Sequence, residues 1–167
     1  MRDVQRFDEF YRETSARVMR YGYALVGEAA EAQDVVQEAY ARAWRDWRTV
    51  ADHPAPEAWV RLTVARLATD RWRRLTGWRN AMSRSGPLPS VGPPSENTVL
   101  LTRALRQLPP NHRQAVALHY LYDMPVAQIG AEMGATENTV KSWLSRGRTA
   151  LASLLTDPAA APVLGVQ

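Results

Sequence analysis

Residues 125–148 read PVAQIGAEMGATENTVKSWLSRGR, and their spacing predicts two helices joined by a tight turn. Pro125 suits the first turn of a helix that Gly134 closes, and Thr136 is a good N-cap for the helix that follows. Apolar anchors, and a glycine where the two helices cross, occur at workable spacing: Ile129, Gly130, Met133, Val140 and Leu144. The pattern predicts a helix-turn-helix.

The second helix of this motif is expected to expose a polar and basic face, made of Asn138, Lys141, Ser142, Ser145, Arg146 and Arg148. Such a face fits the major groove of DNA, where arginine can read guanine and asparagine can read adenine. The alternative is a helical hairpin whose basic face meets only solvent. DNA binding is favoured because the glycine turn, the cap and the basic helix coincide.

The rest of the chain reads as all-α, since no window alternates apolar and polar residues. Residues 80–97, NAMSRSGPLPSVGPPSEN, hold four prolines, two glycines and four serines, which predicts a flexible linker. This linker would join two small helical domains, residues 1–79 and residues 98–156. Residues 157–167 contain two prolines and are expected to be a disordered tail.

In the N-terminal part, apolar positions recur with helical spacing from Ala32 to Trp47 and again from Glu57 to Trp78. A break is expected at Thr49–Pro56, because its two prolines forbid a continuous helix. Residues 7–26 supply one or two further packing helices. Trp72 lies on the apolar stripe of its helix and is expected in the core.

Charge is segregated along this part of a chain whose net charge is +4. Four acids and no base lie between residues 28 and 38, whereas residues 57–79 hold six arginines against two acids. Asp34, Gln37 and Glu38 point away from the apolar stripe, so they form either a solvated face or a docking face. Trp59 and Trp78 belong to the core or stack on unpaired bases.

Several function classes lack their signatures in this sequence. There is no cysteine, and the three histidines lack the HExxH spacing of a zinc protease, so no metal site is expected. No phosphate-binding glycine loop or GxSxG elbow is present, which argues against an enzyme and against a cofactor. Without a signal peptide or membrane-spanning stretch, the protein is expected to be cytoplasmic, with no membrane contact.

Two motifs resemble a known family. The string AQDVVQEAYARAW at residues 32–44 and the string LPPNHRQAVALHYLYDMPVAQIGAEMGATENTVKSWLSRGR at residues 108–148 look like a bacterial extracytoplasmic function (ECF) sigma factor. The nearest likeness is to the actinobacterial SigE-type subfamily. Residues 1–79 would then be sigma region 2 and residues 98–156 sigma region 4.

The resemblance implies an alternative sigma factor that directs promoter-specific transcription, monomeric when free. Its implied partners are promoter DNA and the β′ clamp helices and β flap of the RNA polymerase core. The core-binding positions would be Asp34, Gln37 and Glu38. The −10 element would be recognised and melted by His53, Trp59, Arg61, Arg66, Arg71 and Arg73. The −35 element would be read by Asn138, Thr139, Lys141, Ser142, Ser145, Arg146 and Arg148.

Two positions depart from the family pattern, and one rival function remains. Arg66 stands where many relatives carry asparagine, and Trp143 stands where many carry arginine, which affects the expected promoter sequence. The family's regulators often include an anti-sigma factor, but no residue here identifies one. The rival is a stand-alone helix-turn-helix regulator that binds an operator by itself, which would leave the acidic helix unexplained.

Overall fold

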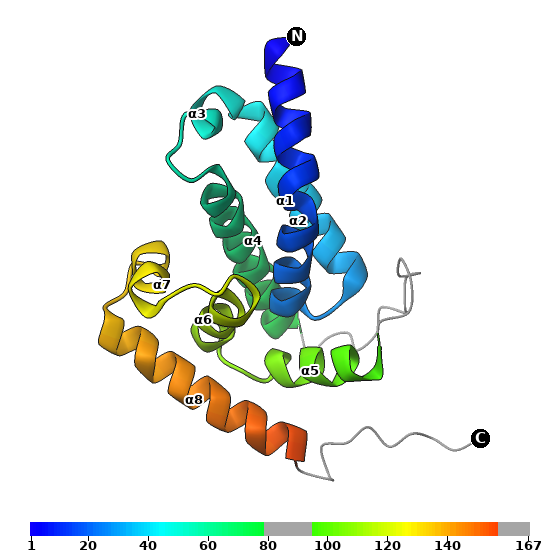
Figure 1. The fold of residues 1–167 in the computed structure, drawn as a ribbon. Helices are drawn as coiled ribbons and strands as arrows, with labels where there is room; N and C mark the ends of the chain where they lie inside the picture. Colours follow the sequence, from blue (N-terminus) through cyan, green and yellow to red (C-terminus); the bar gives the residue numbers. More distant parts are fainter. Residues whose placement is uncertain (79–94, 157–167) are drawn as a thin grey trace, which may run out of the picture. The chain divides into compact units, whose positions relative to one another are not determined.

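The computed structural model describes residues 1–78 and 95–156, and side chains only outside residues 75–78. These ranges contain eight α-helices and no strand, which confirms the all-α prediction (Figure 1). The chain divides into two compact units, residues 1–91 and 92–167. Most of the predicted linker and all of the predicted tail lie outside the described residues. A helix begins at Glu96, so the last two residues of the predicted linker are helical.

Unit 1 consists of α1 (Arg2–Val26), α2 (Ala29–Arg45), α3 (Trp47–Ala51) and α4 (Pro56–Trp78). Helices α1, α2 and α4 pack against one another, and the short α3 touches all three. Helix α1 alone spans residues 7–26, where the sequence predicts one or two helices. It is followed by Gly27, whose φ of 86° a glycine adopts without strain. The helical break predicted at Thr49–Pro56 is shorter than expected, because residues 49–51 belong to α3.

The core of unit 1 lies where α1, α2 and α4 meet, and its most deeply buried side chains include Val18, Tyr21, Val35, Val60 and Val64. Gly22 permits the close approach of α1 to α2, because a Cβ there would lie 2.7 Å from a methyl group of Val36.

The expectation that Trp72 belongs to this core is wrong, since the side chain is 40% exposed. Ala65 is the last buried residue among the described side chains of α4. Arg71 already lies beside Asp34, close to the start of α2. Beyond that point, little of α2 remains for α4 to pack against.

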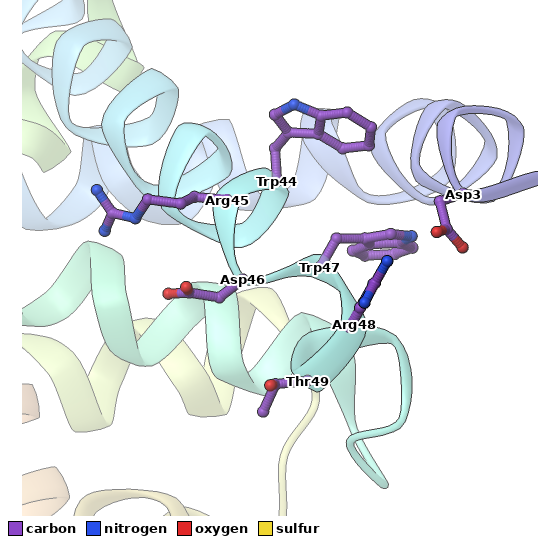
Figure 2. A pocket seen from close by; sticks show the side chains of 7 residues that line it. All are labelled: Asp3, Trp44, Arg45, Asp46, Trp47, Arg48 and Thr49. Carbon is purple, nitrogen blue, oxygen red and sulfur yellow. The ribbon is translucent and has the colours of Figure 1, made fainter. Parts of the chain in front are cut away.

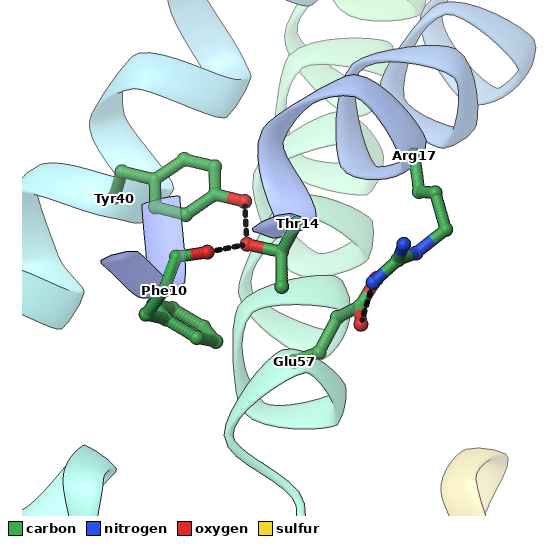
Figure 3. A network of polar contacts seen from close by, with 5 residues as sticks. All are labelled: Phe10, Thr14, Arg17, Tyr40 and Glu57. Atoms are coloured by element: carbon green, nitrogen blue, oxygen red, sulfur yellow. Dashed lines mark hydrogen bonds and ion pairs between the residues drawn. The ribbon is translucent and has the colours of Figure 1, made fainter. Parts of the chain in front are cut away.

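A polar network ties α1 to both neighbouring helices (Figure 3). The Thr14 hydroxyl lies 2.7 Å from the Tyr40 hydroxyl of α2 and donates to the Phe10 carbonyl, also at 2.7 Å. Arg17 forms a two-pronged ion pair with Glu57 of α4 at 3.1 and 3.0 Å. Burial raises the pKa of Tyr40 to about 12, so the phenol stays neutral under ordinary conditions.

Unit 2 consists of α5 (Glu96–Arg106), α6 (Pro110–Leu121), α7 (Val126–Met133) and α8 (Glu137–Thr156). Helix α8 packs against the other three, and α6 also contacts α7. Gly147 allows α8 to lie close to α6, because a Cβ there would be 2.8 Å from a Val116 methyl group.

The predicted helix-turn-helix is present as α7, the turn at residues 134–136 and α8. Gly134 has a φ of 66°, and its N–H donates to the Gly130 carbonyl. Thr136 caps α8 by accepting the Thr139 N–H at 3.3 Å. Pro125 precedes α7 as its N-cap residue and is not part of the first helical turn.

Arg113 holds the junction between α5 and α6 from within unit 2. It is only 5% exposed, and its guanidinium donates to the carbonyls of Leu105 at 2.8 Å, Arg106 at 3.0 Å and Leu108 at 2.9 Å. These carbonyls lie at and just beyond the end of α5, where the regular helical ladder stops, and the Leu105 carbonyl also accepts the Leu108 N–H at 3.1 Å. Burial lowers the pKa of Arg113 to about 10, so the group remains charged at neutral pH.

Candidate functional site

The acidic surface of α2 faces solvent, as the sequence predicted. Asp34, Gln37 and Glu38 are exposed, while Val35, Val36 and Ala39 on the opposite side are buried. The Asp34 and Glu38 side chains are 65% and 50% exposed. Glu38 pairs with Arg42 at 2.8 Å, and Asp34 lies 3.9 Å from Arg71 of α4. This acidic face is therefore open to a partner without any rearrangement of the core.

On α4 the structure separates the −10 candidates into two groups. Trp59, Arg66 and Arg73 are spaced seven residues apart, which is two helical turns, so they share one side of the helix. Arg66 and Arg73 are exposed, and Trp59 is half-buried. This row joins an aromatic ring to two guanidinium groups, a combination suited to bases and phosphates.

The other two arginine candidates on α4, Arg61 and Arg71, point elsewhere. Arg71 turns toward α2, where it meets Asp34. Arg61 is 6% exposed, which differs from the DNA-facing side chain that the sequence predicted. It lies one residue after the fully buried Val60, on a helix that packs against both α1 and α2. In accessibility to a binding partner, the row of Trp59, Arg66 and Arg73 therefore exceeds Arg61.

His53 occupies the short loop between α3 and α4 and is exposed. Its Nδ1 accepts the Ala55 N–H at 3.0 Å, so the other ring nitrogen, Nε2, is not used in this hydrogen bond. Trp78, the other tryptophan expected either in the core or stacked on bases, ends α4, and its side chain lies outside the described residues.

A hollow of about 310 Å³ opens beside the start of α1, near the corner where α2 passes into α3 (Figure 2). Trp47, which is 6% exposed, lines it, and no group of the described residues forms a hydrogen bond with its indole N–H. The full lining is Asp3, Trp44, Arg45, Asp46, Trp47, Arg48 and Thr49. No sequence pattern predicts this hollow, because Asp3 is brought to the other six lining residues only by the packing of α1.

Helix α8 presents most of its predicted polar face. Asn138, Lys141, Ser145, Arg146 and Arg148 are exposed, and Thr139 and Ser142 are partly covered. Trp143 is half-buried, as its place at the edge of the apolar stripe predicts.

The two arginines near the middle of α8 lie on opposite flanks of the helix, because Gly147 between them is buried against Val116. Arg146 faces His112 of α6, whose pKa is lowered by burial and by the charge of Arg146. Arg148 faces Tyr120, whose hydroxyl accepts its Nε–H at 2.6 Å. His112 and Tyr120 were missed by sequence reasoning, since only the packing of α6 on α8 brings them there.

Two further findings concern the described residues alone. Residues 1–78 and 95–156 contain no cluster of three or more histidine, aspartate or glutamate side chains that could hold a metal ion. None of the helices in these ranges is long and apolar enough to cross a bilayer.

Comparison with known proteins identifies both units. Residues 10–79 match the family model for Sigma-70 region 2, and residues 98–151 match the model for Sigma-70 region 4. The ECF RNA polymerase sigma factor SigL of Mycobacterium tuberculosis is 36% identical over 145 residues, covering 80% of each chain. The chain belongs to the ECF sigma factors. It is therefore an alternative sigma factor that directs promoter-specific transcription, which confirms the resemblance found in the sequence.

Further relatives of this ECF sigma factor agree with that assignment. The RNA polymerase sigma-E factor of Streptomyces coelicolor is 30% identical over 148 residues, covering 87% of this chain and 84% of the relative. Among solved structures, the sigma factor RpoE of Bartonella quintana, crystallised with the anti-sigma factor NepR, matches with a TM-score of 0.75. That match covers 90% of this chain and 97% of the other, and at 19% identity it shows the fold alone.

Proposed function

We propose that the two units of this sigma factor divide the work of promoter recognition. Unit 1 binds the clamp helices of the polymerase β′ subunit through Asp34, Gln37 and Glu38, and contacts the −10 element through α4 and His53. Unit 2 reads the −35 element through α8 and meets the β flap. The observation that carries the proposal is the acidic face of α2, whose side chains are exposed and take no part in the core.

The charge of each surface supports the assignment. A basic helix on a partner would be attracted to the acidic face of α2, where no base lies between residues 28 and 38. The row of Trp59, Arg66 and Arg73 offers stacking and positive charge for a melted strand. Asn138, Lys141 and Arg146 lie in the first half of α8, the part that enters the major groove in a helix-turn-helix.

Within the α4 candidates, we place the −10 contacts on Trp59, Arg66 and Arg73 first. Arg71 follows, because its pairing with Asp34 is solvent-exposed and can be exchanged for a phosphate. Arg61 is the weakest candidate, since its side chain would have to leave the packed interface before it could reach DNA.

An anti-sigma factor is a further proposed partner. One structure with this fold, RpoE, is a complex with the anti-sigma factor NepR, and another, CnrH, is a complex with the cytosolic domain of CnrY. A regulator of this kind added to a reconstituted transcription reaction is expected to lower transcription by this sigma factor and leave transcription by another sigma factor unchanged.

The experiment that tests the proposal combines the full chain with RNA polymerase core and a library of genomic DNA fragments, followed by sequencing of the run-off transcripts. We expect start sites that share −10 and −35 elements and that vanish without the chain. A specific footprint by the chain alone, with no new start sites when core is added, would contradict the division of labour and favour operator binding.

A further inference from the structure

Tyr120 of α6 and Arg148 of α8 form an exposed pair beside the helix-turn-helix. The Arg148 Nε–H donates to the Tyr120 hydroxyl at 2.6 Å, and the guanidinium carbon lies 5.6 Å from the centre of the tyrosine ring. The ring of His119 meets the Tyr120 ring edge-on, with centroids 4.9 Å apart. His119 in turn is held by its Nδ1, 3.1 Å from the Met124 carbonyl oxygen.

This arrangement fixes an arginine that would otherwise move freely. A solvent-exposed arginine loses considerable rotamer entropy when its position is fixed. The packing of α6 on α8 does not require this fixation, because Gly147 of α8 is already buried against Val116 of α6. Tyr120 is itself 56% exposed, so burial of its ring is not the reason for its position.

The position of Arg148 along α8 indicates what the pair binds. Lys141 precedes Arg148 by seven residues, so both basic groups lie on the same flank of the helix. Arg146 lies on the other flank, because Gly147 between the two arginines is buried against α6. The flank that holds Lys141 and Arg148 therefore places two cations in a row beside the Tyr120 hydroxyl. This flank lies to one side of the exposed face of α8.

The donors that remain on this flank suit a phosphate. After donating its Nε–H to Tyr120, Arg148 keeps the four N–H groups of its two terminal nitrogens. The Tyr120 hydroxyl accepts that bond and retains its own hydrogen for another acceptor. Contacts of this kind to backbone phosphates position a protein on DNA and carry no sequence information.

We infer that Tyr120 is a positioning residue that holds Arg148 for a DNA backbone phosphate, and that its hydroxyl donates to the same phosphodiester group. The inference rests on the proposed reading of the −35 element by α8. It adds α6 to the DNA-binding surface of unit 2.

The test uses polymerase core reconstituted with the full chain, bound to promoter fragments recovered from the run-off experiment over a range of KCl concentrations. The variants are Tyr120→Phe, Arg148→Ala, the double variant of these two, and Arg146→Ala. Arg103→Ala, which removes an exposed charge from α5, is the matched control. Thermal melting of each variant checks the fold.

Arg148→Ala is expected to reduce the slope of log K against log salt by about 0.9, the value for one lost phosphate contact. Tyr120→Phe keeps the ring and the charge, and is expected to weaken binding roughly 2- to 10-fold on all promoters, as the loss of one hydrogen bond does. In the double variant, the loss should be smaller than the product of the two single losses. Arg103→Ala should change neither the slope nor the affinity.

Unchanged affinity and salt slope in Tyr120→Phe, with a clear effect of Arg148→Ala, would overturn the inference and leave the proposed function standing. Independent, multiplicative effects of the two substitutions would overturn it as well. If Arg146→Ala and Arg148→Ala both leave promoter binding unchanged, α8 does not read DNA. Both the proposed function of unit 2 and this inference would then fail.

Discussion

Nη2 of Arg71 lies 3.9 Å from Oδ2 of Asp34, and this ion pair connects the acidic face of α2 to the basic helix α4. Both side chains are partly exposed, at 37% and 65%, and such solvated pairs add little to the free energy of unfolding. The pair places a residue proposed for polymerase binding beside one proposed for the −10 element. Variants at Asp34 must therefore be measured for polymerase binding and for DNA binding separately.

Reversing the acidic face should abolish polymerase binding without unfolding the protein. Replacing Asp34 and Glu38 by arginine changes the local charge by four units, and like charges brought together at an interface cost several kcal/mol. The substitutions are at exposed sites, where the stability usually changes by about 0.5 kcal/mol or less. We expect normal melting, no complex with core in size-exclusion chromatography and no transcription.

The control for this reversal is the double variant Glu9→Arg and Glu13→Arg, two exposed acids that are also four residues apart, on α1. It makes the same change in charge and should bind core normally. Equal loss of binding in both double variants would mean that net charge, and not the α2 face, governs the association.

Arg146 should contribute sequence specificity. Arg146→Ala is expected to cost roughly 1–3 kcal/mol on the cognate promoter and to relax the preference at one position of the −35 element. Removing its charge should also raise the pKa of His112, because a nearby cation disfavours protonation of the imidazole. Selection from a randomised promoter library and NMR titration of His112 measure the two effects, and an unchanged preference would contradict the assigned role.

Trp143→Arg should change promoter preference while the fold survives. Trp143 is half-buried at the edge of the stripe formed by Val140 and Leu144, so a long arginine can keep its stem on that surface and its charge in water. The same library selection measures the change in preference. Loss of cooperative melting of unit 2, followed by circular dichroism, would show instead that the indole is part of the core.

Arg113→Met should destabilise unit 2 strongly. The substitution leaves the carbonyls of Leu105, Arg106 and Leu108 without the guanidinium that now bonds them, at a cost of roughly 2–4 kcal/mol. Urea unfolding of the full chain should show a lower midpoint for the transition of unit 2 and an unchanged one for unit 1. Arg113→Lys keeps the charge but not the planar donor fork, and should recover only part of the loss.

Unit 1 should lose stability in alkaline solution, partly through Tyr40. The pKa of this phenol is about 12 in the folded chain against an ordinary value of 10.0, so the folded state holds its proton over a range where the unfolded state releases it. Its contribution to stability is complete below pH 10 and is lost as the pH rises toward 12. Between pH 9 and 11 (chosen to fall on either side of that onset), the midpoint of urea unfolding should fall more for the wild type than for Tyr40→Phe.

The sequence alone determined the helix-turn-helix and the all-α fold, because the signals that set them are local. Gly134 is suited to a positive φ, Thr136 is suited to an N-cap, and the positions of Ile129, Val140 and Leu144 repeat with the helical period. The exposure of Asp34, Gln37 and Glu38 was predictable for the same reason, since it follows from the angle between each residue and the apolar stripe of its own helix.

Only the tertiary structure decided what depends on a neighbouring helix. Trp72 lies on an apolar stripe yet is exposed, and Arg61 is charged yet buried, because burial depends on where α1 and α2 cover α4. The pairing of Arg148 with Tyr120 likewise joins residues 28 positions apart. Helical periodicity gives the direction of a side chain around its own axis, whereas the partner that it meets is set by the packing of separate helices.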